Sequence, residues 1–310
     1  MLATQALPID VEYQKPGRRR RKITWLPYLL VLPILLYEFV FIIYPIYQGV
    51  ESSFTKQPNI GKPATWTGLD NYRRMLSSDS FWEVTRTTFI YMFAVIIVAI
   101  GFGLGSALVL NRQFRGRTGA RAIMTLPWAF PDVATVLVFI WMLNPNFGVV
   151  NLFWTWLPGA TSQNWLLHPD WALIWVILIT AWKGFPFYSL VILAALQTVS
   201  LDLQDAARVD GANKFQTFRS VTLPAISPTL LLLTVLAAIF AFKQFTIIWL
   251  LTGGGPAGAT ETIVITVYRT AFRFNNFPYA STFGVAGFLM AFTVTLFFLA
   301  IQRRQEREMN

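Results

Sequence analysis

The sequence predicts an all-α, polytopic membrane protein with six transmembrane helices and a helical loop on the cytoplasmic side. Composition is the first reason: 55% of the 310 residues are hydrophobic and only 13% are charged, whereas about a quarter of an ordinary globular chain is charged. The charged residues also leave six apolar stretches, each long enough for the roughly 20 residues that span a bilayer. The third reason is the loop before the fifth stretch, which has the caps and breaks of two short helices.

The apolar stretches contain few charges. Glu38 interrupts the first, Asp132 the third, Lys183 the fourth and Lys243 the fifth, while the second and sixth contain none. The expected spans are residues 25–48, 87–110, 121–143, 171–196, 228–251 and 280–301. Residues 25–301 then form one transmembrane domain, with a basic tail at 1–24, an outer loop at 49–86, an inner loop at 200–224 and a second tail at 302–310.

Basic residues predict the orientation, because Lys and Arg collect in cytoplasmic loops. With both termini in the cytoplasm, most of them lie on the inner side, and the outer side holds Lys56, Lys62, Arg73, Arg74, Arg86, Arg269 and Arg273. We therefore expect a multi-pass protein of the plasma (inner) membrane with cytoplasmic termini. Residues 18–22 are all basic and precede a stretch too long for a signal peptide. They indicate an uncleaved anchor that meets the lipid bilayer, and no nucleic-acid partner.

Several kinds of chemistry are excluded. The chain has no cysteine and one histidine, His168, so neither a thiolate nor a histidine-rich metal site is expected. Its acids are too scattered for a catalytic cluster, so we expect no catalytic residues, no metal and no enzyme activity. Residues 252–258 are glycine-rich but lack the lysine of a phosphate-binding loop. The chain itself should bind no cofactor, and its energy must come from a partner or an ion gradient.

The inner loop is the most informative segment. Ser200 is a good helix cap, and Asp202 and Asp205 follow where a helix dipole favours acids. Gly211 permits a sharp turn. A second short helix is expected at residues 213–220, ended by Leu223 and Pro224. On the residues alone, this loop is either a projection that docks into another protein or a connector packed on its own chain.

A longer pattern in this loop carries a family resemblance. Asp205, Ala206 and Ala207 are followed after three residues by Gly211, and after nine more by residues 221–224, which read Val-Thr-Leu-Pro. This pattern resembles the Glu-Ala-Ala-x3-Gly-x9-Ile-x-Leu-Pro loop, or EAA motif, of bacterial ABC importer permeases, with Asp for Glu and Val for Ile. Over about residues 25–300, other segments resemble the MalF/UgpA-like carbohydrate permeases, namely 68–72, 182–187, 193–197, 251–256 and 268–272.

The resemblance implies a division of labour. This chain would be the permease of an ATP-driven importer of a sugar or oligosaccharide and would form half of the substrate pathway. Its partners would be a second, homologous permease, two copies of an ABC ATPase that hold ATP and Mg, and an extracytoplasmic sugar-binding protein. The inner loop would be the coupling loop that docks into the ATPase, through Asp205, Ala206, Ala207, Val209, Asp210, Gly211, Ala212 and Phe215. The alternative is an ion-coupled secondary transporter of a polar solute.

Charges inside the spans supply candidates for the pathway, because a central charge costs about 2.5–3.5 kcal/mol on insertion scales and therefore faces the interior. Either an acid pairs with a lysine to fix the helices, or these side chains contact substrate, with neighbouring aromatic rings stacked on sugar. The candidates are Glu38, Asp132, Trp182, Lys183, Phe185, Phe242, Lys243 and Gln244. Gly101 and Gly105 predict close helix packing, and Pro127 and Pro131 predict a kink in the third span.

Overall fold

The computed structural model describes residues 25–56 and 63–309, so the predicted basic tail at 1–24 lies outside the described residues. The chain divides into two units, which meet between Tyr47 and Gln48. In the first unit, α1 (Leu26–Glu38) continues through a π-helical turn, η1 (Phe39–Ile43), into the start of α2 (Tyr44–Ser53), whose remainder belongs to the second unit. The apolar helix Tyr28–Ser53 is long enough to cross a membrane, which matches the first predicted span.

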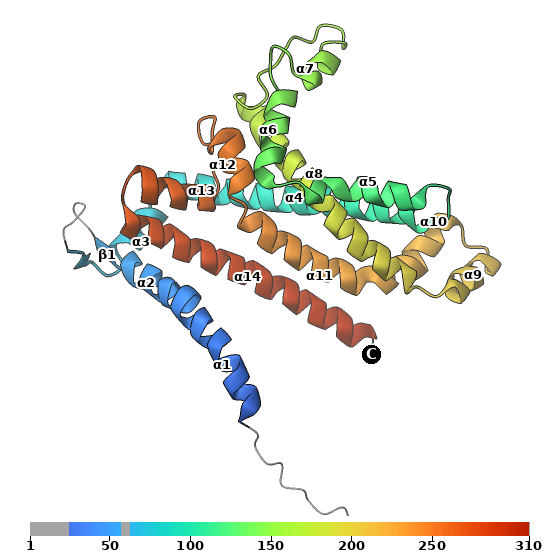
Figure 1. The fold of residues 1–310 in the computed structure, drawn as a ribbon, viewed down its shortest axis with the longest axis horizontal. Coiled ribbons are helices and arrows are strands. Elements are labelled where there is room, and N and C mark those ends of the chain that lie inside the picture. The colour runs from blue at the N-terminus through green and yellow to red at the C-terminus, as the bar shows by residue number, and fades with distance from the viewer. Residues whose placement is uncertain (1–24, 57–62, 310) are drawn as a thin grey trace, which may run out of the picture. The chain divides into compact units, whose positions relative to one another are not determined.

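After the end of α2, the second unit has a small two-stranded sheet and is then helical (Figure 1). β1 (Thr55–Lys56) pairs antiparallel with β2 (Thr65–Trp66), with Thr55 opposite Trp66. The helices that follow are α3 (Asp70–Leu76), α4 (Asp79–Asn111), α5 (Arg117–Ala129), α6 (Asp132–Met142), α7 (Val149–Trp154), α8 (Pro169–Gln197), α9 (Leu201–Val209), α10 (Lys214–Thr217), η2 (Phe218–Thr222), α11 (Leu223–Phe242), α12 (Thr246–Thr252), α13 (Ile263–Tyr268), η3 (Arg269–Arg273) and α14 (Phe277–Met309).

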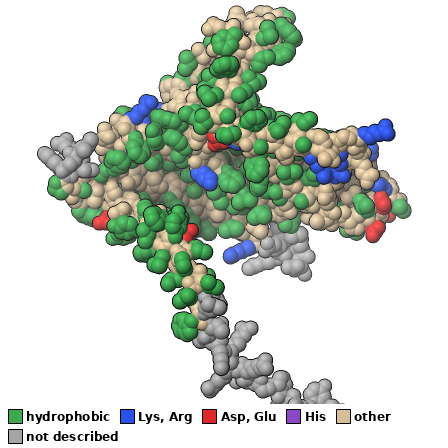
Figure 2. All heavy atoms as spheres, in the orientation of Figure 1, with side chains coloured by type: hydrophobic (Ala, Val, Ile, Leu, Met, Phe, Trp, Pro, Cys, Tyr) green, Lys and Arg blue, Asp and Glu red, His purple; other side chains and the backbone are tan. Residues whose placement is uncertain are grey.

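Within the described residues, five helices are long and apolar enough to span a bilayer, and the α5–α6 pair makes a sixth if both halves count as one span. The predicted all-α membrane fold is therefore confirmed. Residues 302–309 of the predicted cytoplasmic tail are helical and continue α14 as far as Met309, and their place in the cytoplasm stays a prediction. Apolar side chains cover much of the surface, while Lys, Arg, Asp and Glu gather at the end where α9 and α10 lie (Figure 2).

Two predicted spans are corrected. The third is not one kinked helix, because α5 and α6 meet at an angle of 96°. Phe130 is extended, with ψ 142°, as the residue before a proline prefers. The helix that contains the fifth span runs from Lys214 to Phe242, whereas the expected span was 228–251, and α12 is a separate short helix. Pro224 does not end the loop helix, contrary to the prediction. The π-helical turn η2 lies just before it, so the N–H that proline lacks falls where the hydrogen-bond register of the helix changes.

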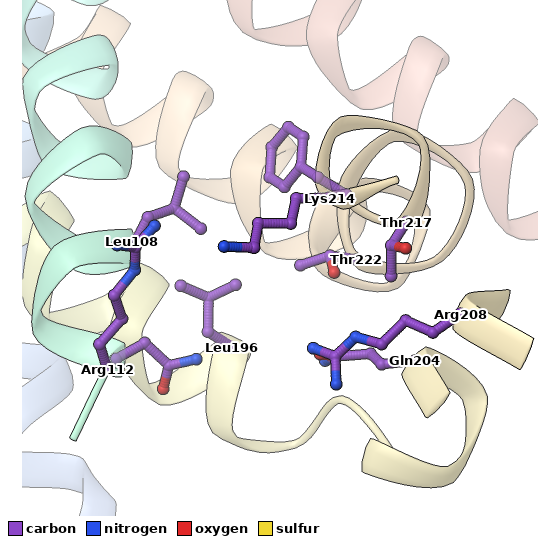
Figure 3. A pocket seen from close by; sticks show the side chains of 10 residues that line it. Leu108, Arg112, Leu196, Gln204, Arg208, Lys214, Thr217 and Thr222 are labelled. Carbon is purple, nitrogen blue, oxygen red and sulfur yellow. The ribbon is translucent and has the colours of Figure 1, made fainter. Parts of the chain in front are cut away.

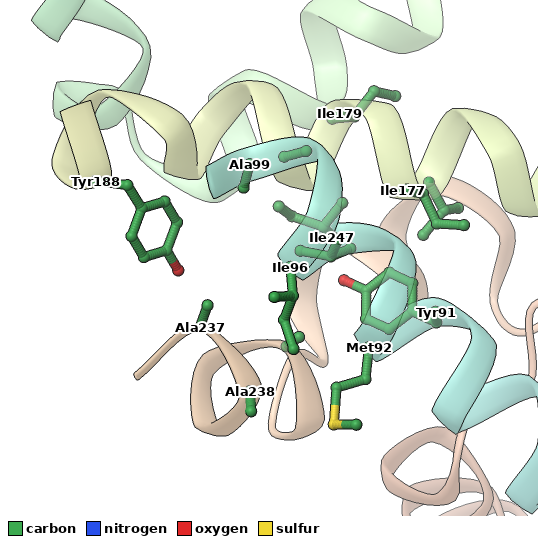
Figure 4. Packing of buried hydrophobic residues seen from close by; sticks show 14 of the residues in the cluster. Tyr91, Met92, Ile96, Ala99, Ile177, Ile179, Tyr188, Ala237, Ala238 and Ile247 are labelled. Carbon is green, nitrogen blue, oxygen red and sulfur yellow. The ribbon is translucent and has the colours of Figure 1, made fainter. Parts of the chain in front are cut away.

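The core of the second unit is the contact between α4 and α8, on which α11 also packs. Met92, Ala99, Val176 and Ile192 are fully buried there, and Figure 4 shows the interlocking of such side chains. Small residues and hydroxyls allow the close approach. The Tyr91 hydroxyl donates to Thr180 Oγ1 at 3.0 Å, and Ser106 Oγ donates to Ser189 Oγ at 2.9 Å.

The glycine that permits this packing is Gly103 and not the predicted pair Gly101 and Gly105. A Cβ on Gly103 would lie 2.9 Å from Tyr188 Cβ and 3.2 Å from the Ser189 backbone nitrogen, whereas Gly101 and Gly105 have open space around them. The spacing of small residues did mark α4 as a packing helix. It did not show which of its faces meets α8.

Gly103→Val should therefore destabilise the protein, by about 1–3 kcal/mol as for other overpacked cores. The added methyl groups would push α8 away at Tyr188, where the contacting atoms belong to a Cβ and a backbone that cannot rotate aside. Thermal unfolding in detergent measures the effect, with Gly105→Val as the matched control on the same helix. Equal melting temperatures for the two variants would contradict this assignment of the interface.

Candidate functional site

A central cavity of about 370 Å³ lies among α4, α8, α11 and the break between α5 and α6. Its walls are apolar apart from one group of polar side chains, Asp132, Thr180, Lys183, Tyr188, Lys243 and Gln244. Four of the eight predicted pathway residues, Asp132, Lys183, Lys243 and Gln244, therefore come together here from three separate regions of the chain. A few donors and acceptors among apolar walls are typical of small-molecule binding sites, and a role of these residues in a substrate pathway stays a prediction.

Lys183 holds the broken span together from the opposite helix. Its Nζ lies 3.2 Å from Asp132 Oδ1 and donates a hydrogen bond of 2.6 Å to the Phe130 carbonyl. Phe130 follows the last residue of α5, and Asp132 is in the first turn of α6. A break in a membrane span leaves backbone groups without partners. The single ammonium satisfies one such carbonyl and neutralises the carboxylate that favours the start of α6.

The sequence left two roles open for Asp132 and Lys183, an ion pair that fixes the helices or contact with substrate. The geometry is compatible with both roles. The predicted pairing of Asp132 with a lysine is present, and the pair also lines the cavity. The exposed fraction is 15% for the Lys183 side chain and 34% for that of Asp132. Asp132 therefore keeps an accessible edge toward the cavity.

Lys243 and Gln244 stand at the end of α11. Lys243 is its C-terminal cap, with an exposed side chain whose Nζ lies 5.0 Å from the centre of the Phe240 ring. Among the described residues Lys243 forms no ion pair, in contrast to Lys183. The half-buried Gln244 lies beside it on the cavity wall. The ammonium and the amide are thus the lining groups most available to hydroxyls of a solute.

The three aromatic candidates lie elsewhere. Trp182 and Phe185 line a different, almost wholly apolar cavity of about 390 Å³, where Trp182 contacts the Phe139 ring and Phe185 the Phe102 ring. On a helix of 3.6 residues per turn, these positions project away from the face that carries Lys183 and Gly184. Phe242 is only 8% exposed and belongs to the core. These three side chains do not surround Lys183 as expected from their proximity in sequence.

The rings that do line the central cavity are Trp128, Tyr188 and Phe240. Thr180, Gly184 and Tyr188 recur every four residues, which is a helical stripe that the sequence could have revealed. Nothing local marked Trp128, because its position depends on the break at Phe130. Glu38, the remaining candidate, ends α1 in the first unit with an exposed side chain, and its role stays a prediction.

The predicted helix, glycine turn and helix of the inner loop are present as α9, Gly211 and α10. Gly211 has φ +86°. Its N–H binds the Arg208 carbonyl at 3.0 Å, and the Ala212 N–H binds the Ala207 carbonyl at 2.9 Å. This is the Schellman arrangement that ends helices at a glycine. Ser200 occupies the cap position of α9, but its side chain makes no capping hydrogen bond.

The second loop helix begins with a capping box. Asn213 Oδ1 accepts hydrogen bonds from the backbone N–H groups of Phe215 and Gln216, at 3.0 and 2.9 Å, and Gln216 Oε1 accepts one from Asn213 N–H at 2.8 Å. Such a box satisfies donors that a helix start leaves free. With the Schellman turn before it, the loop has a defined backbone shape, as a docking element requires.

The surface of this loop combines charge with exposed apolar side chains. Val209 is 87% exposed and Phe215 is 69% exposed. Asp205 accepts a hydrogen bond of 2.8 Å from Arg208 within the same helix, while Asp210, Ala206 and Gly211 are also exposed. Apolar side chains that project from a rigid polar loop indicate an interaction surface. The alternative of a connector packed on its own chain does not account for Val209 and Phe215.

A bundle of long apolar helices, a broken span beside a polar cavity and a structured loop at one end define a membrane transport component. Residues 98–310 match the family described as binding-protein-dependent transport system inner membrane component. The chain belongs to this family. The resemblance seen in the spacing from Asp205 to Pro224 is thereby confirmed, and membership favours the permease interpretation over the ion-coupled transporter.

Individual relatives cover nearly the whole chain. The trehalose/maltose transport system permease protein MalF of Thermococcus litoralis is 34% identical over 278 residues, which is 90% of this chain and 94% of the relative. The sulfoquinovosyl glycerol transport system permease protein SmoG of Agrobacterium fabrum is 33% identical, over 90% of both chains. A chain in the crystal structure of a bacterial ABC transporter that imports the acidic polysaccharide alginate is 26% identical, with a TM-score of 0.79 over 90% of this chain and 96% of that one.

Proposed function

We propose that this chain is the permease subunit of an ATP-driven importer for a sugar or oligosaccharide, that it forms half of the substrate pathway, and that it couples to a separate ATPase through residues 200–224. The observation that carries the proposal is the coupling loop itself, with its fixed turn at Gly211 and its exposed Val209 and Phe215. Two relatives, which are named as transport system permeases for trehalose/maltose and for sulfoquinovosyl glycerol, support the substrate class.

The remaining partners follow from the same proposal. A second, homologous permease supplies the other half of the pathway, and two ATPase copies hold ATP and Mg. An extracytoplasmic sugar-binding protein delivers substrate, an assignment supported by a similar transporter structure solved with its oligosaccharide-bound periplasmic protein. The complex lies in the plasma (inner) membrane with both termini of this chain in the cytoplasm. Sugar hydroxyls meet Lys243 and Gln244 in the central cavity, where Trp128 offers an aromatic face.

The test is co-purification from mild detergent, with mass spectrometry and an ATPase assay in the presence of the binding protein and candidate sugars. We expect an ATPase and a second permease to accompany the wild-type chain and sugar to stimulate hydrolysis. Val209→Asp should release the ATPase, because it puts a charge at the most exposed apolar position of the loop.

Arg219→Gln is the control, since it changes an exposed side chain of the same loop and leaves its apolar surface intact. It should retain the ATPase. A wild-type chain that purifies without any ATPase would refute the proposed function, and retention of the ATPase by Val209→Asp would refute the docking surface.

A further inference from the structure

A second cavity, which we call the loop cavity, lies behind the coupling loop and has a volume of about 490 Å³. Its walls come from the ends of α4 and α8 on one side and from α9, α10 and η2 on the other. Figure 3 shows the Lys214 ammonium and the Arg208 guanidinium directed into the space between these elements. The polar side chains of its wall are Asn111, Arg112, Gln204, Arg208, Lys214, Thr217 and Thr222.

The charge of the loop cavity is unbalanced. Arg112, Arg208 and Lys214 line it, and no acidic side chain does. Asp205 Oδ1 accepts a hydrogen bond of 2.8 Å from Arg208 Nη1. Arg112 and Lys214 form no ion pair with any residue of the described chain. Three cations around one hollow repel one another unless an anion joins them.

We propose that the loop cavity binds a phosphate group. Arginine forks match phosphate oxygens in pairs, and lysine adds a point charge. The cavity lies at the ends of α4 and α8, two helices long enough to span the membrane, which is the depth at which lipid headgroups meet basic pockets. The phosphate therefore comes from an anionic phospholipid headgroup or from a soluble phosphate ester.

Binding would join two parts of the molecule that otherwise repel. Arg112 follows the end of α4, whereas Arg208 and Lys214 belong to the coupling loop. A phosphate held by all three fixes the loop against the spanning helices. That consequence for coupling rests on the proposed function, whereas the binding site itself does not.

The test compares two double variants with the same change in charge. Arg112→Gln with Lys214→Gln removes two cations from the cavity wall. Arg115→Gln with Arg219→Gln removes two exposed cations from the neighbouring segments, neither of which lines the cavity. The full chain, with the subunits that co-purify, is titrated with dioleoyl phosphatidylglycerol or dioleoyl phosphatidylcholine, and bound lipid is counted by native mass spectrometry. Inorganic phosphate and glycerol 3-phosphate are added as soluble competitors.

Wild type should prefer phosphatidylglycerol, and the cavity variant should lose about tenfold or more in affinity, given about 1 kcal/mol for each basic residue. The surface variant should stay within about twofold, and Lys214→Arg, which keeps the charge, should bind as wild type does. Displacement by soluble phosphates identifies a soluble ester, and lipid that they do not displace identifies a headgroup. Equal losses in both double variants would overturn the site, as would a wild type that neither prefers phosphatidylglycerol nor binds inorganic phosphate or glycerol 3-phosphate more tightly than the cavity variant does. Neither result depends on whether an ATPase co-purifies, so failure of the proposed function is seen separately.

Discussion

Lys183→Met should lower the free energy of unfolding by about 2–3 kcal/mol, somewhat less than the 3–5 kcal/mol for breaking a fully buried ion pair, because Asp132 is partly exposed. The change leaves two groups without their partner at the break between α5 and α6, the Asp132 carboxylate and the Phe130 carbonyl. Transport should fall strongly as well, because the two half-helices that border the central cavity lose the contact that fixes their 96° angle.

The companion variants separate charge from backbone support. Asp132→Asn should be milder, since Lys183 keeps its hydrogen bond to the Phe130 carbonyl. Adding Asp132→Asn to Lys183→Met should recover part of the lost stability, because no unpaired carboxylate remains, and such non-additivity is the mark of a direct interaction. Lys243→Met is the control, being an exposed lysine of the same cavity without an ion pair among the described residues. The free energy of unfolding is measured in detergent and mixed micelles. Equal losses in Lys183→Met and Lys243→Met would contradict the role of Lys183 at the break between α5 and α6.

Gly211→Pro should abolish ATP-driven uptake while leaving membrane insertion intact. Proline fixes φ near −65° and has no N–H, whereas Gly211 has φ +86° and donates to the Arg208 carbonyl. The Schellman turn would be lost, at a cost of about 3 kcal/mol or more for a proline in an incompatible position. The turn sets the direction of Val209 and Phe215, so the loop could no longer present both to its partner.

Graded variants test whether backbone geometry is the cause. Gly211→Asn should retain much of the uptake, because asparagine tolerates the left-handed conformation that ends many helices. Gly211→Ala should fall between. Gly159→Ala is the control. Gly159 has φ +79° with no atom close to it and lies outside the coupling loop, so an alanine there imposes a similar backbone strain at another site. Its uptake should stay near that of wild type. Uptake assays in proteoliposomes provide the measurement, and full activity in Gly211→Pro would show that the turn does not serve coupling.

Much of this molecule can be predicted from local sequence. The length of the uncharged stretches placed the spanning helices, because a bilayer admits only long apolar helices or closed barrels. Gly211 and the predicted helix start at residue 213 marked the end of one loop helix and the start of the next, where the structure has a Schellman turn and a capping box. Ser200, the cap that the sequence suggested for the first of these helices, makes no capping hydrogen bond. Pro131 predicted a distortion of the third span. It predicted neither the 96° angle between α5 and α6 nor the contacts of Lys183 with Phe130 and Asp132 at the break.

What the sequence by itself determined is which stretches of the chain form long apolar helices and where the loop before α11 turns, since these depend on residues a few positions apart. The bounds of the fifth span and the break at Phe130 were decided by the tertiary structure. Only the tertiary structure decided which face of each helix meets which neighbour. The tertiary structure put Gly103 rather than Gly105 at the contact with α8, turned Trp182 away from the central cavity, and brought Arg112 and Lys214 to the wall of one cavity from distant parts of the chain. The physical reason is that a membrane helix is apolar all round, so hydrophobic periodicity, which identifies the buried face of a soluble helix, carries little information here.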